Sequence, residues 1–354
     1  MSLLQVRNLT QYYPNSTAPL PALDDVSLEV AKDSVVAVVG ESGCGKTTLG
    51  RIASGLLKPT EGEVIFDDQQ VWKLPRSAWN GYRRRVQIIQ QDPYASLNPG
   101  LTLMESLRPG LLRHKIVPRR QVTEEALRLL ALVGLDDDEA FLRRFPHQLS
   151  GGQRQRFAIA RAVSLRPDLI VADEPTSMLD VSVRVAILDL LLALQAEEGL
   201  AYVFISHDFG VVRYFTRGGR IVVMFFGQVV EEGPAEQIIG RPRHPYSFQL
   251  LEAIPVPDPR TVRARARQID EADLEDRVDQ PPSLTGCIFA NRCPFADDAC
   301  RSTRPPLIEV APGHRAACLY PERVPDLPDA VRTVVEPGAA DVEIDEGLAT
   351  AHNR

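Results

Sequence analysis

A glycine-rich segment near the N-terminus has the residue types needed to hold a polyphosphate. Residues 40–47 read Gly-Glu-Ser-Gly-Cys-Gly-Lys-Thr and directly follow the apolar run at residues 35–39. Glycines in such a turn let backbone N–H groups point at phosphate oxygens, and the following helix start adds partial positive charge. Lys46 would reach the terminal phosphates, and the Thr47 hydroxyl would be a ligand of Mg²⁺. The predicted nucleotide-binding residues are Gly40, Ser42, Gly43, Cys44, Gly45, Lys46, Thr47 and Thr48.

Two carboxylates follow a second apolar run, at residues 169–172. In an enzyme with a phosphate loop, the first carboxylate holds Mg²⁺, and the second can orient and deprotonate the attacking water. Asp173 is therefore predicted to bind Mg²⁺ together with Thr47, and Glu174 is predicted to be the catalytic base.

A third segment, Ser150-Gly151-Gly152-Gln153, precedes a run with helical spacing. A hydroxyl and two glycines that expose backbone amides at a helix start form a second anion-binding site. One nucleotide cannot readily use two such sites of one subunit if they lie on different lobes. The two sites together predict a head-to-tail dimer, in which each nucleotide lies between the phosphate loop of one protomer and residues 150–153 of the other.

These elements require a sheet that brings the ends of several strands together. Apolar runs at residues 35–39, 169–172 and 202–206 alternate with helical patterns, which predicts an α/β fold with a parallel sheet. Alternating residues near the N-terminus predict an additional antiparallel sheet, and apolar residues at helical spacing predict a helical insert at about residues 97–165.

The order of the motifs resembles the nucleotide-binding subunit of an ABC transporter over residues 3–240. The resemblance implies a RecA-like P-loop ATPase core with an antiparallel β subdomain and a helical subdomain, and it implies ATP as the nucleotide. By this resemblance Tyr13 stacks on the adenine, with Tyr12 as the alternative, and Gln91 contacts Mg²⁺ or the attacking water. His207 contacts the γ-phosphate, and Asp180 reaches across the dimer.

The C-terminal part resembles the extension of peptide and nickel importers. It carries His244-Pro245-Tyr246-Ser247 and a cluster of cysteines, and we assign it to residues 241–323, followed by an acidic tail at 324–354. Four thiolates in one short segment suit a [4Fe–4S] cluster, with zinc or unligated thiols as the alternatives. The predicted cluster ligands are Cys287, Cys293, Cys300 and Cys318. The intact LSGGQ and the run at residues 92–99 resemble the F-type of the two ATPases in such importers.

Composition limits the class of partner. The net charge of −7 disfavours nucleic acid, and no secretory signal or membrane-spanning run is visible. The resemblance implies a peripheral protein on the cytoplasmic face of the membrane, paired with a second ATPase subunit, two integral permease subunits and an extracytoplasmic substrate-binding protein. The expected cargo is di- or oligopeptides. The alternatives are nickel, glutathione or another small solute, or a soluble ABC-type ATPase of DNA repair, translation or phosphonate breakdown.

Overall fold

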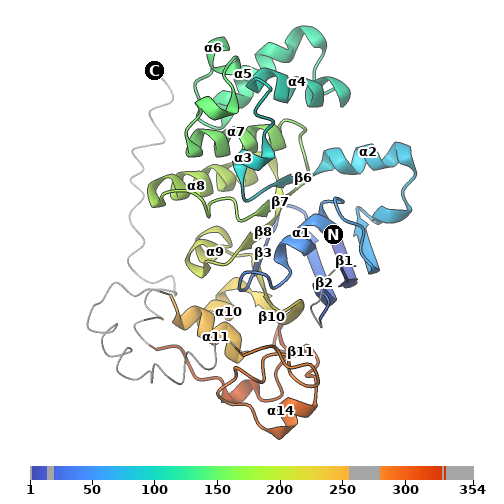
Figure 1. The fold of residues 1–354 in the computed structure, drawn as a ribbon, viewed down its shortest axis with the longest axis vertical. Coiled ribbons are helices and arrows are strands. Elements are labelled where there is room, and N and C mark those ends of the chain that lie inside the picture. The colour runs from blue at the N-terminus through green and yellow to red at the C-terminus, as the bar shows by residue number, and fades with distance from the viewer. Residues whose placement is uncertain (1, 14–19, 255–279, 329–330, 332–354) are drawn as a thin grey trace.

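The computed structural model describes residues 2–13, 20–254, 280–328 and 331. Its strands form two sheets, one of eight strands in the order β11-β12-β10-β9-β3-β8-β7-β6 and one of four in the order β2-β1-β4-β5 (Figure 1). The expected α/β architecture is therefore confirmed.

The centre of the larger sheet is parallel. It contains β3 (Val35–Val39), β6 (Val86–Ile89), β7 (Leu169–Asp173), β8 (Ala201–Ser206) and β9 (Arg220–Phe225). Both faces are buried, which explains why these strands read as continuous apolar runs. In β3, for example, Ala37 and Val39 pack into one apolar cluster, while Val36 and Val38 pack into the cluster on the opposite face.

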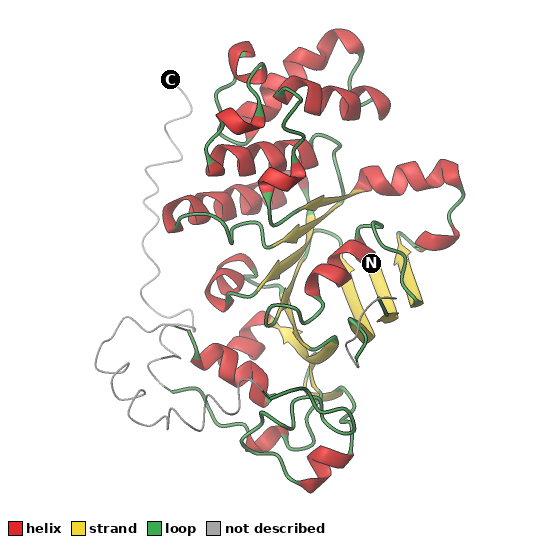
Figure 2. Cartoon of the chain, viewed as in Figure 1, coloured by secondary structure: helices red, strands yellow, loops and turns green. Residues whose placement is uncertain are grey.

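Different elements cover the two faces of this sheet (Figure 2). One face packs against α8 (Val181–Glu198) and α9 (Phe209–Phe215). The other packs against α1 (Lys46–Ala53) and the smaller sheet, formed by β1 (Ser2–Gln11), β2 (Leu23–Ala31), β4 (Glu61–Phe66) and β5 (Gln69–Gln70). The burial of β2 alternates along the strand, which matches the alternation in its sequence.

The segment between β6 and β7 is helical. It contains α3 (Pro93–Ser96), α4 (Leu103–Arg113), α5 (Val122–Leu132), α6 (Glu139–Leu142) and α7 (Gly151–Val163). The other helices among the described residues are α2 (Arg76–Arg85), α10 (Ala235–Gly240), α11 (Pro245–Glu252) and α14 (Asp298–Ser302). Single 3₁₀ turns lie at Val71–Lys73, Arg119–Gln121, Pro146–Gln148 and Pro321–Arg323.

The C-terminal extension continues the larger sheet. Its strands β11 (Ile308–Ala311) and β12 (His314–Ala316) form an antiparallel pair, and β12 pairs with β10 (Gln228–Pro234). Beyond residue 323, Leu327 and Val331 are buried against the core. Most of the expected acidic tail, at 329–330 and 332–354, lies outside the described residues.

Candidate active site

The phosphate loop connects β3 to α1, and its shape depends on two glycines. Gly45 caps α1 with a φ of 105°, and a Cβ there would lie 2.3 Å from the Ala22 carbonyl oxygen. Gly40 has a φ of 153°, and a Cβ there would lie 2.1 Å from the Met224 carbonyl oxygen. Backbone in this region favours glycine, and the close contacts exclude any side chain, so these two positions require it.

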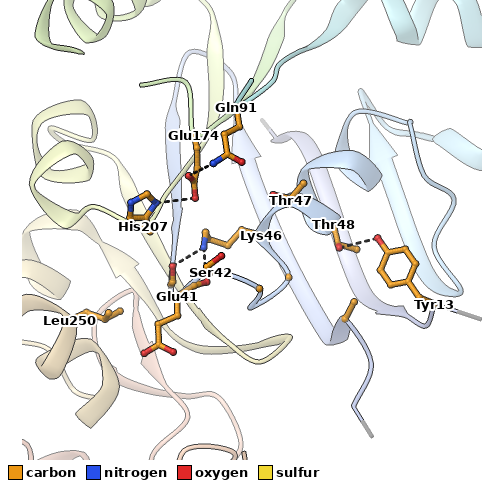
Figure 3. Close-up of a pocket in the computed structure, with 14 residues that line it drawn as sticks. Tyr13, Glu41, Ser42, Lys46, Thr47, Thr48, Gln91, Glu174, His207 and Leu250 are labelled. Carbon is orange, nitrogen blue, oxygen red and sulfur yellow. Dashed lines mark hydrogen bonds and ion pairs between the residues drawn. The ribbon is translucent and has the colours of Figure 1, made fainter. Parts of the chain in front are cut away.

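The loop forms one wall of an open cleft of about 650 Å³ (Figure 3), a size typical of small-molecule sites. The cleft is lined by Tyr13, Ala22, Gly40, Glu41, Ser42, Gly43, Gly45, Lys46, Thr47, Thr48, Gln91, Glu174, His207 and Leu250.

Lys46 is held inside the loop and is only 5% exposed. Its Nζ donates to the carbonyl oxygens of Gly40, at 2.7 Å, and Glu41, at 2.8 Å. The ammonium group therefore already lies beside the backbone that would cradle phosphate.

Thr47 and Asp173 lie together at the base of the loop. Thr47 Oγ1 donates to Asp173 Oδ1 at 3.2 Å. Burial raises the pKa of Asp173, the hydrogen bond from Thr47 lowers it and the nearby charge of Glu174 raises it. Asp173 does not line the open cleft itself. A hydroxyl and a carboxylate fit Mg²⁺, which is usually bound by one or two carboxylates together with substrate phosphates.

Three polar side chains meet above the loop. Gln91 Nε2 donates to Glu174 Oε2 at 3.0 Å, and His207 Nδ1 lies 3.0 Å from Glu174 Oε1 (Figure 3). They follow β6, β7 and β8, whose carboxyl ends lie side by side because the strands are parallel neighbours. Glu174 itself has a φ of 47°, an uncommon backbone conformation of the kind that clusters at functional sites.

Of the two candidate tyrosines, Tyr13 lines the cleft, and its hydroxyl lies 3.2 Å from Thr48 Oγ1. Tyr12 is 54% exposed and is absent from the cleft lining. Three lining residues were not among the predicted ones: Ala22, Glu41 and Leu250. Leu250 comes from α11, more than 200 residues after the loop, and nothing in the sequence around it indicates this contact.

The remaining predicted residues of the ATP site are not part of the cleft lining. Ser150 caps α7, where its hydroxyl accepts from the Gln153 N–H at 3.2 Å and Gln153 Oε1 accepts from the Ser150 N–H at 3.0 Å. Gly151 and Gly152 form the first turn of the same helix. Asp180 is exposed at the start of α8. Cys44 lies within the loop but is buried, and burial raises its pKa.

The predicted iron–sulfur cluster is wrong. Within the described ranges, no three His, Cys, Asp or Glu side chains converge in an arrangement that could hold a metal ion. Burial raises the pKa of all four thiols, to about 11 for Cys293 and about 12 for Cys318. Cys287 and Cys293 are partly buried against the apolar core, and Cys300 is buried, so these cysteines act as small apolar residues in packing.

Comparisons with known proteins agree with this geometry. The family model described as "ABC transporter" matches residues 23–177, and that of the "Oligopeptide/dipeptide transporter, C-terminal region" matches residues 230–300. A Brucella ovis protein named as a peptide import ATP-binding protein is 46% identical over 318 residues, covering 90% of this chain and 97% of the relative. The oligopeptide transport ATP-binding protein AppF of Bacillus subtilis is 38% identical over 325 residues, covering 90% of this chain and 97% of AppF.

The chain belongs to the ATP-binding proteins of ABC transporters. It is an ABC-type ATPase, and membership of this family implies ATP and Mg²⁺ as ligands. Membership also implies that the chain dimerises and has membrane permease subunits as partners.

Solved structures have the same ABC ATPase fold. The dimeric ATP-binding cassette MJ0796, bound to ADP and Pi, matches with a TM-score of 0.58 at 34% identity, covering 66% of this chain and 98% of that one. CbiO1 from Clostridium perfringens, part of the ABC transporter complex cbiONQ, matches with a TM-score of 0.61 at 25% identity, covering 76% of this chain and 99% of that one. Among the described helices of this ATPase, none combines the length and the apolar character needed to cross a bilayer.

Proposed function

We propose that this ATPase hydrolyses ATP to drive import of di- and oligopeptides through two integral permease subunits. The observation that carries the catalytic part is the convergence of Gln91, Glu174 and His207 beside the phosphate loop. The peptide cargo is supported by the match to the oligopeptide/dipeptide C-terminal region and by the names of the relatives.

Each group of residues in the site has its own role in the proposed reaction. The loop amides and Lys46 hold the phosphates, and Tyr13 stacks on the adenine. Thr47, Asp173 and Gln91 are the residues that would hold Mg²⁺, which neutralises charge on the phosphates when bound. Glu174 accepts the proton of the attacking water as the new bond to the γ-phosphorus forms and ADP leaves with the electrons of the broken bond.

Gln91 and His207 contact both carboxylate oxygens of Glu174 and so orient it. His207 also contacts the γ-phosphate, while Gln91 reports the state of the site to the permeases. Closure of the site on ATP and its reopening after hydrolysis would move the permeases between two orientations.

The nucleotide site is completed by residues of a partner subunit. Residues 150–153 and Asp180 are not part of the cleft lining of their own chain, which supports a head-to-tail dimer in which they act on the partner's nucleotide. We propose a mixed dimer with a second ATPase, bound peripherally at the cytoplasmic face, with an extracytoplasmic binding protein delivering peptide. Within the chain, residues 1–240 form the ATPase domain with a helical subdomain at about 97–165, residues 241–323 form the importer extension, and 324–354 form the tail.

The proposal is tested by purifying the tagged chain with its membrane partners and measuring peptide uptake into proteoliposomes. We expect integral membrane subunits to co-purify, and uptake of labelled oligopeptide to require ATP and to stop with Lys46→Ala. Transport of nickel or glutathione in place of peptide would overturn the cargo. An active ATPase that co-purifies with no membrane subunit would favour the soluble class.

A further inference from the structure

Two residues of the C-terminal extension contact Glu41 of the phosphate loop. Tyr246 of α11 accepts a hydrogen bond from the Glu41 N–H through its hydroxyl, at 2.8 Å. Arg292 Nη1 lies 3.0 Å from Glu41 Oε2. The backbone and the side chain of one loop residue are thus both held by residues more than 200 positions later in the chain.

Other contacts hold Tyr246 and Arg292 in position. Tyr246 is only 1% exposed, and its ring packs against Phe225 and Phe289 at centroid distances of 4.6 and 5.5 Å. The Arg292 guanidinium lies 5.3 Å from the ring centre of Phe225 and 5.6 Å from that of Phe226, and its Nε donates to the carbonyl oxygen of residue 280 at 3.1 Å. Groups fixed in this way lose little freedom when they bind Glu41, so they can set its position.

Glu41 is in turn bonded to the phosphate-binding lysine. Its carbonyl oxygen accepts from Lys46 Nζ at 2.8 Å. Gly40 and Gly43, on either side of Glu41, both have positive φ, and glycine restrains the backbone less than any other residue. The entry to the loop therefore depends on outside contacts for its position, and the extension supplies two of them.

We infer that Tyr246 and Arg292 are positioning residues of the ATP site, which act through Glu41 on the phosphate loop and on Lys46. This inference rests on the proposed role of the loop in ATP binding. The extension then contributes to nucleotide affinity as well as completing the fold, although neither residue reaches the reacting atoms.

The test compares ATP affinity and turnover in variants of the full chain. Tyr246→Phe removes the accepting hydroxyl and keeps the packed ring, and Arg292→Gln removes the charge. We expect each change to weaken binding of a fluorescent ATP analogue about threefold to tenfold, the worth of one hydrogen bond. The KM for ATP in the assembled transporter should rise by a similar factor, while kcat at saturating ATP should stay within about twofold, because Glu174 is untouched.

Arg304 provides a matched control. It also joins the extension to the core, through an ion pair of 2.8 Å with Asp24, but it makes no contact with the phosphate loop. Arg304→Gln removes an ion pair between the extension and the core and should leave ATP affinity unchanged. An equal loss of affinity in both variants would reduce Arg292 to a general docking contact and overturn the inference.

A double-mutant cycle checks the route through Glu41. If Arg292 acts through this carboxylate, Arg292→Gln should weaken ATP binding less in a Glu41→Gln background than in the wild type. Strict additivity would contradict that route. Lys46→Ala separates the two proposals: loss of ATP binding in this variant with normal binding in Tyr246→Phe and Arg292→Gln would refute the positioning role alone. Normal binding in Lys46→Ala would refute the ATP site itself.

Discussion

Glu231 joins the extension to the core sheet, and its removal should be costly. It lies on β10 and is fully buried. Its carboxylate accepts from the backbone N–H groups of Arg243, at 2.6 Å, and His244, at 3.1 Å, and His314 Nε2 of β12 lies 2.6 Å from Oε1. Glu231→Ala removes the acceptor from the Arg243 N–H and from two buried groups, the His244 N–H and the His314 ring.

The expected cost follows from these contacts. A buried donor left without a partner costs about 1–3 kcal/mol, and breaking a buried pair typically costs about 3–5 kcal/mol. We therefore expect Glu231→Ala to lower the free energy of unfolding in urea by about 3–5 kcal/mol and to release the extension first.

The neighbouring residue Glu232 is the matched control. It is also buried, but the side chains of its partners Arg315 and Arg220 are 48% and 42% exposed, so water can solvate them after the change. Glu232→Ala should cost about 1 kcal/mol. Equal losses in the two variants, or a loss below about 1 kcal/mol for Glu231→Ala, would refute the reasoning.

Three further predictions concern the dimer, the magnesium ligand and the cysteines. Ser150→Arg should leave ATP binding by the isolated subunit unchanged and block nucleotide-dependent dimerisation, measured by light scattering; weaker binding in the monomer would contradict the trans arrangement. Burial raises the pKa of Asp173 in the folded state, so the folded protein favours the protonated carboxyl. The stability that this carboxyl contributes is present below the unfolded-state pKa and is lost as pH rises through the folded-state pKa. Asp173→Asn should therefore melt above the wild type at neutral pH without Mg²⁺, and this difference should vanish in acid; a lower melting temperature at neutral pH would oppose this. Cys293 and Cys318, with pKa values of about 11 and about 12, should react slowly with iodoacetamide at pH 7 and faster as pH rises. Rapid labelling of the folded protein at pH 7 would show that their pKa values are not raised.

The sequence was most informative where a motif requires one local geometry. The loop at residues 40–47 could be assigned because its glycines, lysine and threonine have few other uses in that order. Glu174 and His207 follow buried strands, and parallel strands bring such ends together, so their meeting was predictable. Gln91 was found by its resemblance to the family motif.

Long-range contacts could not be predicted in this way. Tyr246, Leu250 and Arg292 reach the ATP site through the packing of an extension whose strand β12 joins the core sheet. No periodicity encodes which loop such an extension will touch. The cysteine cluster misled for a related reason. Spacing along the chain shows that four thiols are near one another in sequence, whereas metal ligation depends on how the side chains are arranged in the fold.

The most direct test of the central claim is ATP hydrolysis by the purified transporter that carries Glu174→Gln. The amide cannot accept the proton of the attacking water, so we expect turnover to fall by at least about a hundredfold while ATP binding persists and a closed, ATP-filled dimer accumulates. Undiminished hydrolysis would show that Glu174 is not the catalytic base and would contradict the account of this site.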